Sequence, residues 1–485
     1  MSVRKTIFDS MSMSSVGVLR LLAQFIAIPI LARILSPADY GIVAIAMPFV
    51  MFALVIADVG IGMSLVRTPM ENQREWSTCF WLSLLLGILL TLITLISAPF
   101  VAMLFGEPQL SAMIMALSIV ILMQTASGVH SAALMQTERF KFIAIIETIT
   151  VLTSIIVSVV AAKNGFGAWA LVFQQISLYS IRTILVFLYS PLRIHKIFDI
   201  KNVSEHIKFA KNMLAFNLIT FLTRALDNLI IGKVMDTVAV GIYSMAFQFA
   251  RLPMTLLSGP VQAVFYAKMT KVKNDKHAIR RIFLIITRIL ATIIFPAMGM
   301  VAVAHSSVFT LLLSDKWQAS GRIFMLVAGI TALQAVMNLL CNTVRMALGH
   351  TGAQVRQTTE QGIIWIITMF STIWFGLEAL VIAYSVVFFL YSPRILMLTL
   401  PFIDCSFKEY IRAIVTPIIM TISCIIIYIV LQDTFQQSMI MQFVTAAVLA
   451  IIGITASVLL QYSFFYNEYR EYRLMKNNDY SNYKP

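Results

Sequence analysis

Apolar segments of about twenty residues follow one another along almost the whole chain, and short polar or basic stretches separate them. A helix of that length crosses the roughly 30 Å hydrocarbon core of a bilayer, so each segment predicts one membrane-spanning helix. The chain is therefore expected to be an all-α polytopic membrane protein with about 14 transmembrane helices. The predicted spans are 12–35, 41–66, 78–104, 111–136, 142–162, 166–189, 209–232, 238–265, 281–303, 321–344, 357–375, 379–400, 411–431 and 439–462.

The composition excludes a soluble fold. Only 12% of the 485 residues are Asp, Glu, Lys or Arg, and 59% are hydrophobic, whereas soluble domains carry about 25% charged residues. So few charges cannot cover a body of this size with a water-compatible surface. The net charge of +14 would suggest nucleic acid in a soluble protein. Here the basic residues lie between apolar runs and no nucleic-acid-binding motif accompanies them, so no nucleic-acid partner is expected.

The basic residues also predict how the chain is oriented. Counted over the two terminal segments, the segments between predicted spans and the ends of the spans, 26 of the 36 Lys and Arg residues fall on one side and only 5 on the other. The side richer in Lys and Arg is the cytoplasmic one. Because the number of spans is even, both termini are expected in the cytoplasm. The segments on the opposite side are all short.

Three short sequence segments in the first 200 residues each have a similar segment 200 to 208 residues later, in the same order. This predicts two six-helix halves that enter the membrane in the same direction, with a cleft between them, as in transporters built from parallel repeats. The expected divisions are 1–200 for the N-terminal half, 201–405 for the C-terminal half, 406–465 for two extra transmembrane helices and 466–485 for a cytoplasmic tail. The matched segments are 33–41 with 233–241, 105–107 with 313–315, and Leu188-Tyr-Ser-Pro191 with Leu390-Tyr-Ser-Pro393.

Several motifs resemble those of a known family. Leu31-Ala-Arg-Ile-Leu-Ser-Pro-Ala-Asp-Tyr-Gly41 and Ala57-Asp-Val-Gly-Ile-Gly62 are similar to the opening helices of polysaccharide-export (Wzx-type) flippases. These belong to the MOP superfamily, with the multidrug MATE antiporters and the lipid II flippase. The resemblance covers roughly residues 1–400 and is closest to the colanic-acid-exporter branch. Further matches are 134–140, 146–148, Asp227–Gly232, Gly241–Tyr243, Arg251–Pro253, Gly259-Pro260 and Asp315–Trp317, whereas Phe265-Tyr266 stands where many relatives have Phe-Pro.

The resemblance implies a multi-pass flippase of the bacterial inner membrane. It would move an undecaprenyl-diphosphate-linked oligosaccharide repeat unit from the cytoplasmic to the outer leaflet, for exopolysaccharide, O-antigen or lipopolysaccharide synthesis. Lipid-linked oligosaccharide and membrane lipids are the implied partners, together with polysaccharide polymerase and export proteins.

Two arginines are the leading candidates for binding the substrate. Arg224 and Arg251 fall near the membrane midplane when depth is counted along their predicted helices at about 1.5 Å per residue. Two guanidinium groups at one depth repel unless an anion lies between them, and Arg binds phosphate oxygens in a bidentate manner. A diphosphate would fit such a site. The alternative for Arg224 is local pairing with Asp227, three residues later on the same helix face.

The other ionisable groups inside predicted spans leave two interpretations open. Arg20 and Asp58 have matching depths on neighbouring helices, so they form an ion pair or Asp58 carries a coupling ion. Gln24, the repeat counterpart of Arg224, adds a polar group near Arg20. Glu147 and Arg182 likewise form a structural ion pair or a proton site. Asp58, Asp227 and Glu147 are therefore the candidate carboxylates for ion coupling, and coupling to H⁺, to Na⁺ or to neither remains open.

Three other functions fit the sequence less well. The chain has no Walker A motif, no His-Glu-x-x-His and no Gly-x-Ser-x-Gly, and its four cysteines have no ligand spacing, so no enzyme activity, metal or cofactor is expected. A polysaccharide polymerase or ligase generally needs a sizeable outside loop, which is missing from the predicted topology. A MATE-like cation-coupled antiporter of small molecules shares the fold and is the nearer alternative, but midplane arginines disfavour a cationic substrate.

Overall fold

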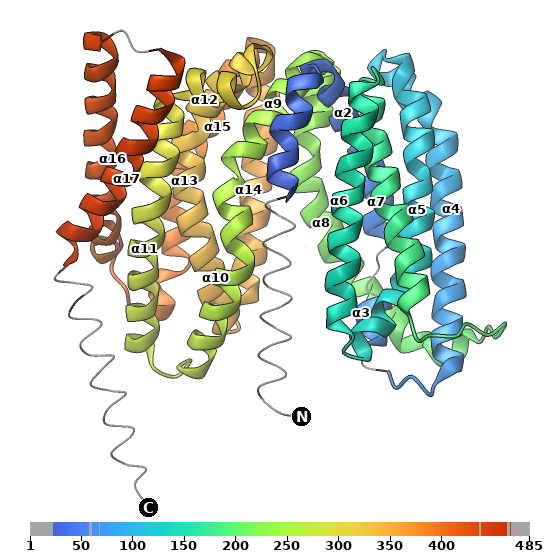
Figure 1. Cartoon of the computed structure of the whole chain (residues 1–485). Helices are drawn as coiled ribbons and strands as arrows, with labels where there is room; N and C mark the ends of the chain where they lie inside the picture. The colour runs from blue at the N-terminus through green and yellow to red at the C-terminus, as the bar shows by residue number, and fades with distance from the viewer. Residues whose placement is uncertain (1–22, 58–60, 67, 436–437, 463–465, 467–485) are drawn as a thin grey trace, which may run out of the picture. The chain divides into compact units, whose positions relative to one another are not determined.

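The computed structural model describes residues 23–57, 61–66, 68–435, 438–462 and 466, and Figure 1 shows these residues as bundles of long α-helices. Ten of the described helices are long and apolar enough to cross a membrane, judged by length and composition. The prediction of an all-α polytopic membrane protein is confirmed. The exact number of fourteen spans stays a prediction.

The chain divides into two compact units, and unit 1 comprises residues 1–245 with 313–317. Within it α4 packs along α5, α6 and α5 both pack against α7, and α2 packs against α8 and α5. Its helices are Ala23–Ile34, α2 (Pro37–Ala57), α3 (Ile61–Leu65), α4 (Gln73–Phe105), α5 (Pro108–Gln136), α6 (Phe140–Lys163), α7 (Trp169–Tyr189), α8 (Ser204–Val234) and the first part of α9 (Thr237–Ala250).

Unit 2 comprises residues 246–312 and 318–485. Its central helix is α11, which packs against α13, α16 and α17, while α13 also packs against α10 and α15. Its helices are α10 (Leu252–Lys271), α11 (Lys276–Val303), α12 (His305–Leu312), α13 (Gln318–Ala347), α14 (Thr351–Thr372), α15 (Leu377–Met397), α16 (Phe407–Phe435) and α17 (Met439–Leu460).

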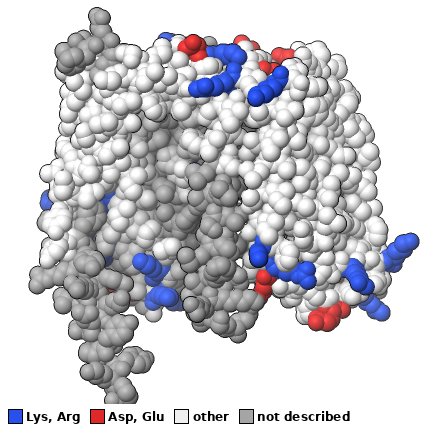
Figure 2. Space-filling view, in the orientation of Figure 1, with Lys and Arg blue, Asp and Glu red and all other residues white. Residues whose placement is uncertain are grey.

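Large apolar side chains cover much of the surface of both units. Phe100 on α4 is 68% exposed, and Ile440 on α17 is 66% exposed. Figure 2 shows a visible face that is white over the middle of the helices, with Lys, Arg, Asp and Glu gathered toward their ends. Exposing apolar side chains of this kind to water costs free energy, whereas exposing them to the hydrocarbon of a bilayer does not. The described surface is therefore that of a protein embedded in lipid.

Local sequence explains where several helices begin. In Ser36-Pro-Ala-Asp39, the Ser36 backbone N–H donates to Asp39 Oδ2 at 2.8 Å and the Asp39 N–H donates to Ser36 Oγ at 3.2 Å. This reciprocal pair is a capping box, and Pro37 at the first helical position fits α2 without loss of a hydrogen bond. Ser406 and Glu409 form the same pair before α16.

Two predicted spans differ from the helices observed. The range 41–66 covers most of α2 and all of α3, and the range 238–265 is divided at Arg251 into α9 and α10. The division at Arg251 is slight, because the Arg251 N–H still donates to the Phe247 carbonyl and its own carbonyl still accepts from Thr255. Pro253 follows at the second position of α10 and fits a new helix start. Hydropathy alone could not show this turn, since apolar residues continue on both sides.

The repeated letters Leu-Tyr-Ser-Pro adopt two different conformations. The helix α7 ends at Tyr189, and Ser190 is extended, with its Oγ accepting the N–H of Leu192 at 3.2 Å. In α15 the helix continues through Pro393, and Ser392 Oγ donates to the Phe388 carbonyl at 2.9 Å. The four shared residues therefore do not by themselves decide whether the helix continues.

Candidate functional site

The repeated segments 33–41 and 233–241 lie against each other in unit 1. A Cβ atom on Gly41 would lie 1.6 Å from the Thr237 carbonyl oxygen, and one on Gly241 would lie 1.9 Å from the Pro37 carbonyl oxygen. The first turns of α2 and α9 are therefore in reciprocal backbone contact. Any side chain at either glycine would force the two helices apart.

The turn Asp315–Trp317 covers this same segment. Trp317 is fully buried and its Nε1 donates to the Ala32 carbonyl at 2.8 Å, and its ring meets Tyr40 edge-on with centroids 5.2 Å apart. A buried indole N–H needs such an acceptor, so Trp317 fixes the position of the turn on the chain before α2. Three of the motifs that carried the family resemblance thus meet in one place.

Asp227 is a buried carboxylate, 5% exposed, beside this contact. The Tyr243 hydroxyl on α9 donates to Asp227 Oδ2 at 2.9 Å. One residue along, Asn228 Oδ1 accepts from Ser244 Oγ at 3.2 Å and Asn228 Nδ2 donates to the Ala44 carbonyl at 3.4 Å. Hydrogen bonds of polar side chains therefore connect α8 to α9 and α2 inside unit 1. Polar groups within a membrane protein often serve a function.

The predicted substrate residues are only partly described. Arg20 and Asp58 lie outside the described residues, and so does the side chain of Arg224, whose backbone lies on α8 one turn before Asp227. Gln24 is half-buried on the helix Ala23–Ile34. The structure therefore does not test the pairing of Arg20 with Asp58.

Arg251 belongs to unit 2 and lies at the turn between α9 and α10. Its guanidinium carbon is 5.1 Å from the centroid of the Phe247 ring, which in turn meets Tyr384 edge-on at 5.4 Å. The side chain is exposed. Contact with an aromatic face orients the Arg251 guanidinium, and guanidinium groups are well suited to binding phosphate.

Glu147 and Arg182 are in contact, as their matched depth suggested. Arg182 Nε lies 3.1 Å from Glu147 Oε1, and Arg182 Nη1 donates to Gln124 Oε1 at 3.1 Å. The contact joins α5, α6 and α7 within unit 1, and both charged side chains are about three-quarters buried or more. Because each charge is compensated, this geometry suits a structural pair.

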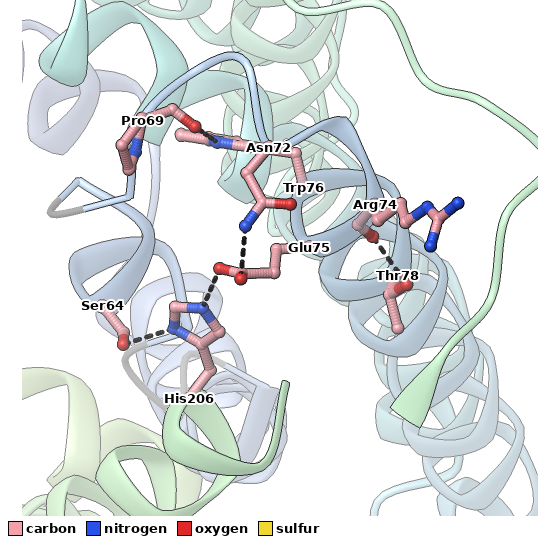
Figure 3. A network of polar contacts seen from close by, with 8 residues as sticks. All are labelled: Ser64, Pro69, Asn72, Arg74, Glu75, Trp76, Thr78 and His206. Atoms are coloured by element: carbon pink, nitrogen blue, oxygen red, sulfur yellow. Dashed lines mark hydrogen bonds and ion pairs between the residues drawn. The ribbon is translucent and has the colours of Figure 1, made fainter. Parts of the chain in front are cut away.

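A polar network at one end of unit 1 was missed by the sequence analysis (Figure 3). His206 on α8 lies between Ser64 and Glu75, with Nδ1 2.6 Å from Ser64 Oγ and Nε2 3.2 Å from Glu75 Oε2. Asn72 donates to the other oxygen of Glu75. These residues lie up to 142 positions apart in the chain, so no local pattern could have joined them.

The segment that leads into α8 is attached to α4 beside this network. The N–H groups of His195 and Asp199 donate to Ser77 Oγ at 3.0 Å and Thr78 Oγ1 at 3.1 Å, and Trp81 Nε1 donates to the His195 carbonyl at 2.9 Å. The start of α8, the helix of Arg224 and Asp227, is thereby fixed to α3 and α4.

Comparison with known proteins places this fold in a family. The family model described as "Polysaccharide biosynthesis protein" matches residues 30–322, and the chain belongs to that family. It is 24% identical over 341 residues to the teichuronic acid biosynthesis protein TuaB of Bacillus subtilis (strain 168), covering 70% of each chain. It is 23% identical over 343 residues to the lipopolysaccharide biosynthesis protein WzxC of Escherichia coli (strain K12), covering 70% of this chain and 69% of WzxC. The resemblance seen in the sequence is confirmed.

Solved structures with the same fold are membrane transporters. The lipid II flippase MurJ in an inward closed conformation aligns with a TM-score of 0.71 over 95% of this chain and all of MurJ, at 14% identity. An inward-facing multidrug MATE transporter of the MOP superfamily aligns with a TM-score of 0.60 over 79% of this chain and 94% of its own, at 13% identity. The fold of this chain is therefore similar to the fold of these two proteins.

Proposed function

We propose that this chain is a flippase that moves an undecaprenyl-diphosphate-linked oligosaccharide repeat unit across the bacterial inner membrane, for exopolysaccharide or O-antigen synthesis. The observation that carries the proposal is membership of the polysaccharide biosynthesis family, combined with a fold shared with a lipid II flippase. The lipid-linked oligosaccharide is the proposed substrate, and a polysaccharide polymerase and export proteins are the proposed partners. The protein acts as a transporter and not as a catalyst.

Arginine side chains are the proposed binding groups for the diphosphate. Arg224 and Arg251, with Arg20 and Gln24, would supply N–H donors to the phosphate oxygens. The cation–aromatic contact of Arg251 with Phe247 supports this role, because it orients the guanidinium. The proposed halves, 1–200 and 201–405, would then alternate access to this site from the two sides of the membrane.

The proposed ion-coupling residue is Asp227, with Asp58 as the second candidate. Asp227 is buried and accepts a hydrogen bond from the neutral Tyr243 hydroxyl. Glu147, which contacts Arg182, is proposed as a structural partner.

Asp227→Asn is expected to leave the protein abundant but to reduce the rate of export about tenfold or more. A tenfold lower rate corresponds to an increase of about 1.4 kcal/mol in activation free energy. The amide keeps an oxygen to accept the Tyr243 hydrogen bond but no longer carries charge or titrates. Tyr243→Phe removes the hydrogen bond while keeping the carboxylate, and serves as the matched control. Normal export by Asp227→Asn would exclude a role for its charge.

Both termini are proposed to lie in the cytoplasm, and labelling of engineered cysteines tests this. The four native cysteines are buried, so they give little background. A membrane-impermeant thiol reagent added to intact cells is expected to label Asn164→Cys and not Asn274→Cys, although both positions are exposed. Labelling of Asn274→Cys from outside would contradict the proposed orientation.

The experiment that tests the function is removal of the gene. Lipid-linked oligosaccharide is expected to accumulate on the cytoplasmic face of the inner membrane, and the intact gene should reverse this. The fold similarity to a MATE transporter supports one alternative, a cation-coupled antiporter of small molecules. That alternative predicts normal glycan export and greater sensitivity to cationic drugs.

A further inference from the structure

Two surface arginines share one glutamate at one end of unit 2, beside a third arginine. Glu360 on α14 accepts from Arg356 Nε at 2.8 Å and from Arg394 Nη2 on α15 at 3.2 Å. The Tyr391 hydroxyl donates to the same carboxylate at 2.8 Å. Arg345 lies nearby at the end of α13, on the other side of Gln357.

Arg345 is fully buried without a compensating carboxylate among the described residues. Its Nη2 donates to Asn342 Oδ1 at 2.6 Å and to Gln357 Oε1, both of which are neutral amide oxygens. Its Nε and Nη1 are buried and have no hydrogen-bond partner in the described part of the chain. A buried guanidinium with unpaired donors costs several kcal/mol unless an anion or water approaches it.

Two other basic residues at this end of unit 2 each pair with a carboxylate of their own. His350, after α13, stacks on Phe402, before α16, with ring centroids 4.0 Å apart, so the two chain segments share one end. There Lys276 pairs with Asp404 at 3.1 Å, and Arg280 pairs with Glu409. By contrast, Arg345, Arg356 and Arg394 have only Glu360 among the described carboxylates, a surplus of two positive charges.

We propose that Arg345, Arg356 and Arg394, held by Glu360, form a binding site for the phosphate of a lipid headgroup. Arg356 and Arg394 are 62% and 38% exposed, so they keep N–H donors at the surface. Exposed apolar side chains continue along the same two helices, with Ile363 54% exposed on α14 and Met397 65% exposed on α15. A basic cluster that borders an apolar surface suits a phosphate attached to a lipid chain better than a free phosphate ion.

Two lipids carry the required chemistry: a bilayer phospholipid and a polyprenyl diphosphate. If the second binds selectively, the site is a first contact for the transported lipid, and that assignment rests on the proposed function. The site differs from the proposed Arg224 and Arg251 site, because its residues lie on α13, α14 and α15.

The test measures lipid binding to the purified full chain in phosphatidylcholine nanodiscs by native mass spectrometry. Undecaprenyl diphosphate and phosphatidylglycerol are titrated in separate arms. The double variant Arg356→Gln with Arg394→Gln is expected to bind at least one of them about tenfold more weakly, a loss of about 1.4 kcal/mol. Arg322→Gln removes an arginine about as exposed as Arg356, paired with Glu378, and should bind normally.

Glu360→Gln separates headgroup binding from a purely structural network. It raises the charge of the cluster, so lipid affinity should be kept or increased. Weaker binding by Glu360→Gln, or wild-type affinity of the double arginine variant for both lipids, would overturn the proposal. If the double arginine variant binds only undecaprenyl diphosphate more weakly, the site is specific for the transported lipid. If it binds both lipids more weakly, the site is a general headgroup site. Since binding is measured without export, failure here leaves the proposed flippase function standing.

Discussion

Gly41→Ala is expected to lower the amount of folded protein in the membrane about tenfold or more. The new Cβ would lie 1.6 Å from the Thr237 carbonyl oxygen, which is backbone and cannot rotate away. The start of α2 would have to move off α9, and overpacking of this kind costs about 1–3 kcal/mol or more. Abundance is measured by quantitative immunoblotting of membrane fractions, and thermal stability on the purified protein.

The matched control is Gly128→Ala, on α5 of the same unit. A Cβ there meets nothing within 4 Å, so abundance and stability should stay near normal. Gly241→Ala should behave like Gly41→Ala, because its Cβ would lie 1.9 Å from the Pro37 carbonyl oxygen. Normal abundance of both variants would mean that the two helices do not meet as described.

Arg251→Ala is expected to abolish export while leaving protein abundance unchanged. Its contact with the Phe247 ring is worth only about 0.5–1 kcal/mol at an exposed site, so folding should tolerate the loss. If Arg251 holds the diphosphate, its charge matters more than its shape. Arg251→Lys should therefore keep partial export, measured as cell-surface polysaccharide per unit of protein.

Arg322→Ala provides the control for the loss of one exposed positive charge in unit 2. Its partner is Glu378, and export should continue. If Arg251→Ala and Arg224→Ala both export normally, the diphosphate is not held by these arginines.

The helices could be predicted because lipid imposes one simple rule, a long apolar stretch for each crossing. The predicted helix boundaries were wrong where this rule gives no information. The turn at Arg251 lies inside a continuous apolar run, and Leu-Tyr-Ser-Pro ends α7 but continues within α15. In neither case does the hydrophobic pattern of the sequence indicate where the helix ends.

The candidate site was predictable where depth along a helix was informative. Matched depth placed Glu147 beside Arg182, which are in contact. It could not place His206 with Ser64 and Glu75, or identify Glu360 as the acceptor shared by Arg356 and Arg394. These contacts depend on which helices pack side by side, and the position of a residue along its own helix does not reveal which helix is its neighbour.

The central claim, movement of a lipid-linked oligosaccharide, is tested most directly with the purified chain in proteoliposomes. A polyprenyl-diphosphate-linked oligosaccharide is placed in the inner leaflet, and its arrival in the outer leaflet is followed with a glycosidase that cannot cross the bilayer. The wild-type chain should make the inner pool accessible far faster than protein-free vesicles do, and Arg251→Ala should not. Cleavage no faster than in protein-free vesicles, from wild-type protein shown to be folded, would contradict the account.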